Sequence, residues 1–107
     1  MNKEEILKEL FKLSQREIID IYETLNGYKN AISRSGKDNL LLRCVFINGY
    51  RSTKEFYNEY NLTKDSAIAT ALFDGCNSLK VYLELKEKLN IDDDTFLKIL
   101  VDKVGDK

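Results

Sequence analysis

Histidine, proline and tryptophan are absent from this chain of 107 residues, and only Cys44 and Cys76 are cysteines. The absence of histidine removes the most common general base of enzymes and the most common ligand of transition metals. Two cysteines cannot complete a zinc site without help from carboxylates, and we interpret both as small buried apolar residues. We therefore expect no metal ion and no cofactor.

Sequence patterns of catalysis are also missing. The chain has no glycine-rich phosphate loop and no acid–base pair with supporting groups. Three adjacent acids, Asp92 to Asp94, stand before a predicted helix, where acidic side chains cap the helix and favour its dipole. We therefore expect that the protein is not an enzyme.

Long apolar runs are absent too. No stretch approaches the roughly 18 apolar residues of a membrane span, and residues 1–5 lack the apolar core of a secretory signal. The composition, 43% hydrophobic and 33% charged, is typical of a folded globular chain, and the length fits one domain. We expect a single cytoplasmic domain over residues 1–107, without disulfides and without membrane contact.

Apolar residues recur at helical spacing along most of the chain, so we expect a mainly α-helical domain of five to six short helices. N-terminal helices occupy residues 1–35, with a cap at Ser14 and a stop at Asn26-Gly27, and a helical core occupies 40–104. The first two segments can also form one long helix. The candidate helical segments are 3–12, 14–25, 28–35, 54–60, 64–73, 79–89 and 94–103.

Residues 40–53 allow two interpretations. Seven of the eight residues from Leu40 to Ile47 are apolar, and so short a run fits either a buried helix or a buried strand. We favour a helix that Asn39 caps. In the alternative, Asn48-Gly49 is the turn of a β-hairpin over 40–53.

Basic side chains are concentrated between residues 28 and 54. This stretch holds six basic residues and one acid, a net charge of +5, whereas the other 80 residues have a net charge of −6. A local basic stretch in an acidic chain is typical of a surface that binds a polyanion such as nucleic acid. The residues are Lys29, Arg34, Lys37, Arg43, Arg51 and Lys54, with Asp38 as the acid.

Two segments have the pattern of a helix-turn-helix, in which a short turn holds a second helix at a fixed angle. In the first, the helices are 14–25 and 28–35, and the second offers Tyr28, Lys29, Asn30 and Arg34. In the second, the helices are 54–60 and 64–73, joined by a turn at 61–63, and Lys64, Ser66 and Thr70 face the DNA. A winged version of the first adds the 40–53 hairpin as a wing that carries Arg43 and Arg51.

A family resemblance supports the second segment. The opening Thr53-Lys54-Glu55-Phe56, the turn Asn61-Leu62-Thr63 and the apolar spacing of Ser78 to Ile91 and Ile91 to Leu97 resemble the phage-repressor class of helix-turn-helix domains, of the lambda repressor and Cro type. The resemblance covers residues 52–97, under half of the chain. It implies DNA binding by the helix at 64–73, usually as a dimer.

The sequence therefore predicts a sequence-specific double-stranded DNA-binding protein, a small regulator or accessory factor of a bacterial phage or mobile element. The alternative is a helical bundle that binds and inhibits another protein, which the acidic remainder of the chain favours. The expected DNA contacts are Tyr28, Lys29, Asn30, Arg34, Lys37, Arg43, Arg51, Lys54, Lys64, Ser66 and Thr70.

We also expect a homodimer. The C-terminal helix carries an apolar stripe that either forms part of the dimer interface or docks on helix 79–89 within one chain. The stripe consists of Phe96, Leu97, Leu100, Val101 and Val104.

Overall fold

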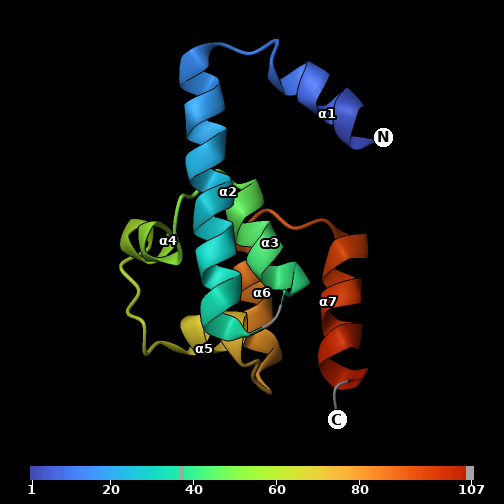
Figure 1. Ribbon diagram of the computed structural model, residues 1–107. Helices are drawn as coiled ribbons and strands as arrows, with labels where there is room; N and C mark the ends of the chain where they lie inside the picture. The colour runs from blue at the N-terminus through green and yellow to red at the C-terminus, as the bar shows by residue number, and fades with distance from the viewer. Residues whose placement is uncertain (37, 106–107) are drawn as a thin grey trace.

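Seven α-helices make up most of the computed structural model, which describes residues 1–36 and 38–105 (Figure 1). The prediction of a mainly helical protein is confirmed, although the described residues form seven helices rather than five to six, and α2 with 21 residues is long. The helices are α1 (Lys3–Leu10), α2 (Gln15–Ser35), α3 (Leu40–Ile47), α4 (Thr53–Glu59), α5 (Ala67–Phe73), α6 (Leu79–Lys88) and α7 (Asp93–Gly105).

Helix α2 is continuous, so the predicted stop at Asn26-Gly27 is wrong. The helix begins at Ser14, whose hydroxyl accepts the backbone N–H of Glu17 while the Glu17 carboxylate accepts the N–H of Ser14. It ends at Gly36, whose φ of 78° is left-handed. Gly27 keeps a helical backbone, and its missing side chain lets the Arg51 carbonyl approach α2 closely. The first helix-turn-helix candidate is therefore not formed.

Helix α3 agrees with the helical interpretation, and the alternative hairpin wing over 40–53 is not supported. Asn39 caps the helix by accepting a backbone N–H at 2.7 Å. Five of its eight residues are buried, including consecutive ones, whereas a strand with one buried face would alternate. The Asn48 side chain donates to the carbonyls of Cys44 and Leu89 at 2.8 and 2.9 Å, which fixes the end of a helix instead of a hairpin turn.

The connection between α4 and α5 spans residues 60–66, which is longer than the three- or four-residue turn of a helix-turn-helix. We expected a turn at 61–63 and a helix that begins at residue 64. Instead, Ser66 caps α5 by accepting the backbone N–H of Ala69 at 3.2 Å, so the helix begins three residues later than predicted. The helix-turn-helix geometry of the second candidate is therefore not confirmed.

The last two helices lie where the sequence predicts them. Ser78 caps α6 by accepting the N–H of Val81 at 3.4 Å. The Asp92 carboxylate accepts the N–H of Thr95 at 3.4 Å, and Asp93 and Asp94 occupy the first turn of α7. The capping role that we assigned to these acids is confirmed for Asp92.

The apolar stripe expected on α7 is divided between two environments. Phe96 is buried and Leu100 is half-buried, whereas Leu97 and Val101 are each 61% exposed. Lys37 and the side chain of Val104 lie outside what the structure describes. The stripe therefore docks partly within the chain and leaves a small outer apolar edge.

A hydrophobic core lies between α3 and the helices around it. The largest fully buried side chains come from α3, α4, α5, α6 and α7, and the C-terminal half of α2 adds Ala31. Asn39 also joins this core, because its side-chain amide donates to the Leu72 carbonyl at 3.1 Å. We call residues 28–101 the body; its largest fully buried side chains are Leu41, Leu42, Val45, Phe56, Leu72, Leu85 and Ile99.

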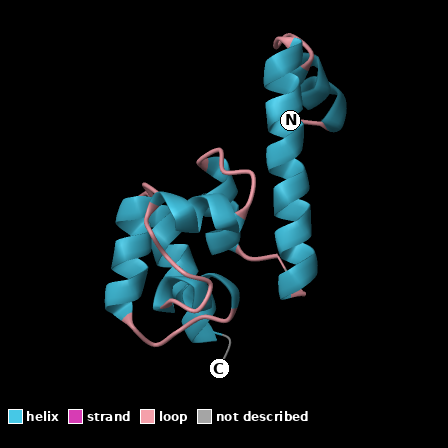
Figure 2. Cartoon of the chain, turned by 90° about the vertical axis from the view of Figure 1, so that its left-hand side faces the viewer, coloured by secondary structure: helices cyan, strands magenta, loops and turns pink. Residues whose placement is uncertain are grey.

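The first 25 residues project from the body. Helix α1 and the first half of α2 rise above the other helices in both views (Figures 1 and 2). No residue of α1 is buried, and the only buried residue of α2 is Ala31, in its second half. We call residues 3–25 the N-terminal hairpin. The chain is thus a compact helical body with a hairpin that the body does not cover.

Candidate nucleic-acid interface

The basic residues of the 28–54 stretch lie on three elements of the body. Lys29 and Arg34 belong to the second half of α2, Arg43 to α3, and Arg51 and Lys54 to the start of α4 and the loop before it. All five are exposed. Side-chain hydrogen bonds join α3, the loop before α4 and α4 itself to α2.

Arg43 is held by a polar cluster that links α2 to α3. Its Nε donates to Asp38 at 2.8 Å and to the Tyr28 hydroxyl at 3.0 Å, and a second guanidinium nitrogen also contacts Asp38. The Tyr28 hydroxyl donates to Asp38, and its ring packs edge-on against Phe46 with centroids 5.6 Å apart. Hydrogen bonds from Arg43 and then Tyr28 lower the pKa of Asp38, which is therefore ionised at neutral pH.

The pKa of Tyr28 moves upward, first because of burial and then because of its hydrogen bond to the Asp38 carboxylate. Tyr28 therefore stays protonated at neutral pH and keeps its hydroxyl as a donor. The hydrogen bonds to Asp38 and Arg43 hold the Tyr28 side chain in place, so its ring is not free to stack on a base. The predicted DNA contact at Tyr28 thus requires this cluster to open.

Arg51 connects the loop before α4 to two helices. Its Nη1 donates to Glu23 of α2 at 2.8 Å, and its Nε donates to Glu55 of α4 at 3.3 Å. Its backbone carbonyl is the group that approaches Gly27. Arg51 therefore positions α4 against α2, a role that the sequence did not reveal because Glu23 lies 28 positions away.

Arg34 ties the end of α2 to α4 and α5. Its guanidinium donates to the Thr53 hydroxyl at 3.0 Å and lies over the Phe73 ring, 5.4 Å from the centroid. Thr53 is the one buried polar residue among those described, so this hydrogen bond satisfies a hydroxyl inside the body. The same bond joins the end of α2 to the first turn of α4, where Lys54 follows Thr53 in the chain.

Four of the expected contact residues have no internal partner. Lys29, Asn30, Lys54 and Lys64 are exposed, and within the described part of the chain they take no part in any ion pair or side-chain hydrogen bond. Lys29 and Asn30 are consecutive exposed residues in the second half of α2. Lys64 lies apart from them, in the 60–66 connection.

Helix α5 offers little to a base edge. Ile68, Ala69, Ala71 and Leu72 are buried, and Thr70 is the only polar residue of the helix. The Thr70 hydroxyl donates to the Ser66 carbonyl at 3.2 Å, and the Ser66 hydroxyl is occupied as the N-cap. Of the two sets of residues that the sequence proposed for reading bases, the set on α2 is therefore the more available.

Neither a cluster of metal ligands nor a membrane-spanning helix is present among the described residues. No three carboxylate or thiolate side chains gather there as ligands, and Cys44 and Cys76 are both free thiols. Burial raises the pKa of Cys44. None of the described helices combines the length and the apolar character that crossing a bilayer requires.

Comparison with known proteins identifies no relative. No protein-family model, no curated protein and no solved structure matches this chain.

Proposed function

We propose that the protein binds double-stranded DNA through the outer surface of the second half of α2 and the first turn of α4. One observation carries the proposal: the Arg34–Thr53 hydrogen bond joins the second half of α2 to the start of α4, where the exposed Lys54 follows Thr53 in the chain. Lys29 and Asn30 lie on the same half of α2. Basic groups from two helices thus share one region of the body, which suits the phosphates of a duplex.

The ion pairs of Arg43 and Arg51 leave both side chains available to DNA. Both are more than half exposed, so each guanidinium and its carboxylate partner remain hydrated and the pair contributes little net stability. A phosphate oxygen accepts hydrogen bonds from a guanidinium as a carboxylate oxygen does, and a DNA duplex supplies many phosphates. These arginines can therefore exchange Asp38, Glu23 or Glu55 for phosphates.

Base recognition is assigned to α2 in this proposal. The major groove admits an α-helix, and asparagine pairs with the edge of adenine while lysine pairs with that of guanine. Asn30 and Lys29 are exposed and unpaired, whereas α5 presents only Thr70. A protein of this size with one such surface suits a small regulator or accessory factor of a phage or mobile element.

Replacing Lys29 and Lys54 together with alanine should weaken binding to a DNA duplex and lower the log–log salt slope by about 1.8, since each lost phosphate contact removes about 0.9. The matched control replaces Lys80 and Lys98, two exposed lysines of α6 and α7. Titration of a labelled duplex at several salt concentrations measures both quantities. Equal effects of the two double variants, or no effect of either, would contradict the proposed surface.

Asp38→Asn should tighten DNA binding by about threefold, because it removes an ionised carboxylate from the basic region and frees Arg43 for a phosphate. The same titration measures the change. Asp94→Asn, which removes an exposed carboxylate of α7, is the control and should leave the affinity unchanged. If both variants tighten binding alike, net charge alone governs the affinity and the site assignment fails.

A second candidate function is the binding and inhibition of another protein. The exposed apolar side chains of the N-terminal hairpin favour it, because soluble proteins rarely leave such a surface without a partner. Salt-dependent retention on immobilised duplex DNA distinguishes the two candidates. A protein that passes through at low salt without retention does not act on DNA.

A further inference from the structure

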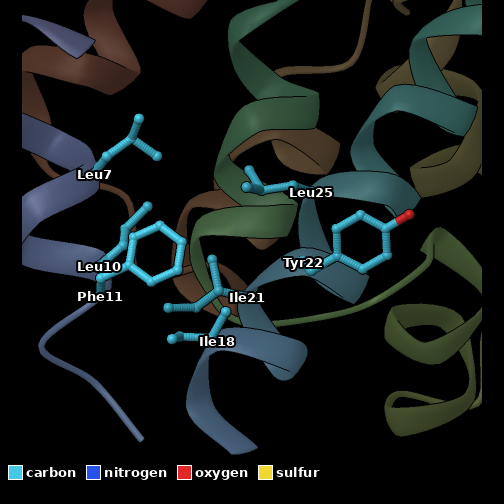
Figure 3. Close-up of a pocket in the computed structure, with 7 residues that line it drawn as sticks. All are labelled: Leu7, Leu10, Phe11, Ile18, Ile21, Tyr22 and Leu25. Atoms are coloured by element: carbon cyan, nitrogen blue, oxygen red, sulfur yellow. The ribbon is translucent and has the colours of Figure 1, made fainter. Parts of the chain in front are cut away.

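An apolar groove runs between the two helices of the N-terminal hairpin (Figure 3). Phe11 and Tyr22 are 71% and 67% exposed at its edges, and Leu25 is 57% exposed. The groove is lined by Leu7, Leu10 and Phe11 of the α1 region and by Ile18, Ile21, Tyr22 and Leu25 of α2.

Helix α1 needs a partner to be stable. It has eight residues, none of them buried. An isolated helix shorter than about 12 residues is marginal in water even with favourable residues, and most helical stability comes from packing of an apolar face. Asn2 caps α1 by accepting the N–H of Glu5 at 2.9 Å, but one exposed cap contributes little by comparison. The apolar face of α1 therefore has to be covered by something outside the body.

We propose that a second copy of this chain covers the groove, so that two N-terminal hairpins pack about a two-fold axis as a four-helix bundle. The exposed area supports this. Phe11 and Tyr22 are 71% and 67% exposed, which corresponds to roughly 200–350 Å² per chain, given roughly 150–250 Å² for each full aromatic side chain. A two-fold pair buries up to twice that, and the exposed parts of Leu7 and Leu25 bring the total toward the size of about 1,000 Å² at which specific interfaces begin. The apolar lining also matches homodimer interfaces, which are more apolar than transient ones.

The charges around the groove favour a protein over a polyanion. Residues 3–25 carry four basic and six acidic side chains, a net charge of −2. This charge opposes binding to DNA and to anionic lipid headgroups. Helix α1 carries both signs, with Lys3 and Lys8 among Glu4, Glu5 and Glu9, so a second hairpin can place its basic residues against the acidic residues of the first.

The outer edge of α7 is a poorer dimer surface. Among the side chains of α7 that the structure describes, Leu97 and Val101 are the strongly exposed apolar ones, because Phe96 and Ile99 face the core. Two aliphatic side chains expose far less area than the groove of the hairpin. The homodimer that we expected through the α7 stripe is therefore assigned to the hairpin instead.

Sedimentation velocity of the full chain at micromolar concentration tests the proposal without DNA, so its result is independent of the proposed function. The wild-type protein should sediment as a dimer, and Phe11→Glu should shift it to a monomer with an at least tenfold weaker self-association. Leu97→Glu is the matched control: it places the same charge on an exposed apolar position of α7 and should leave the dimer intact.

Tyr22→Glu, on the other helix of the groove, should repeat the effect of Phe11→Glu. Circular dichroism should show that the body of each variant stays folded, since both side chains are mostly exposed. A wild-type monomer, loss of the dimer with Leu97→Glu alone, or a monomer that binds neutral lipid vesicles through the hairpin would overturn the proposal.

Discussion

Gly27→Ala is expected to lower the free energy of unfolding by about 3 kcal/mol. The Cβ of an alanine would lie 1.9 Å from the Arg51 carbonyl oxygen and 2.7 Å from its carbon. Both atoms are backbone, so relief requires moving the loop before α4 away from α2, and overpacking of this kind typically costs about 1–3 kcal/mol or more. The gain of about 1 kcal/mol that alanine normally gives inside a helix is too small to offset this.

Urea unfolding followed by circular dichroism measures this change. Asn26→Ala is the control, because Asn26 is exposed and precedes Gly27 in α2. We expect the control to change stability by no more than about 0.5 kcal/mol. A Gly27→Ala variant as stable as the control would show that Arg51 does not pack against α2 in this way.

Phe56→Ala should cost about 3–5 kcal/mol, the range measured for large aromatic side chains in protein cores. Phe56 is completely buried, and its ring packs against Tyr50, Tyr57 and Tyr60 with centroids 5.4 to 6.1 Å apart. Its removal leaves a cavity among rings that cannot all move inward. Because the body is small, a loss of this size should leave much of the protein unfolded near 37 °C.

Ile47→Ala serves as the control in the same unfolding measurement. Ile47 is 80% exposed at the end of α3, so its truncation should change stability by less than about 0.5 kcal/mol. A Phe56→Ala variant that unfolds at the wild-type urea concentration would mean that α4 is not part of the core.

Much of the fold could be predicted from local signals. The caps at Ser14 and Asn39 lie where the sequence places them, because each precedes an apolar stretch with helical spacing. The error at Gly27 has a tertiary cause: a glycine that ends a helix and a glycine that admits a neighbouring backbone look alike in a sequence. Only the approach of Arg51, distant in the chain, distinguishes them.

The candidate site was predictable only in part. The basic stretch could be predicted from the distribution of charged residues along the sequence. The carboxylates that bind its arginines could not, because Glu23 and Glu55 approach Arg51 from two different helices. A count of charges also cannot show that Arg34, although exposed, donates a hydrogen bond to the buried hydroxyl of Thr53. Unpaired residues such as Lys29 could be told from paired ones only after the helices were placed.

The continuity of α2 has a mechanical consequence. One rod carries the N-terminal hairpin at one end and the basic surface of the body at the other, and its 21 residues make it about 32 Å long. With no hinge at Gly27, a rotation of 10° at the hairpin would carry the far end through about 5 Å, comparable to the rise of one helical turn. Helix α2 therefore acts as a lever: the angle at which two hairpins meet would fix the spacing and orientation of the bodies they carry.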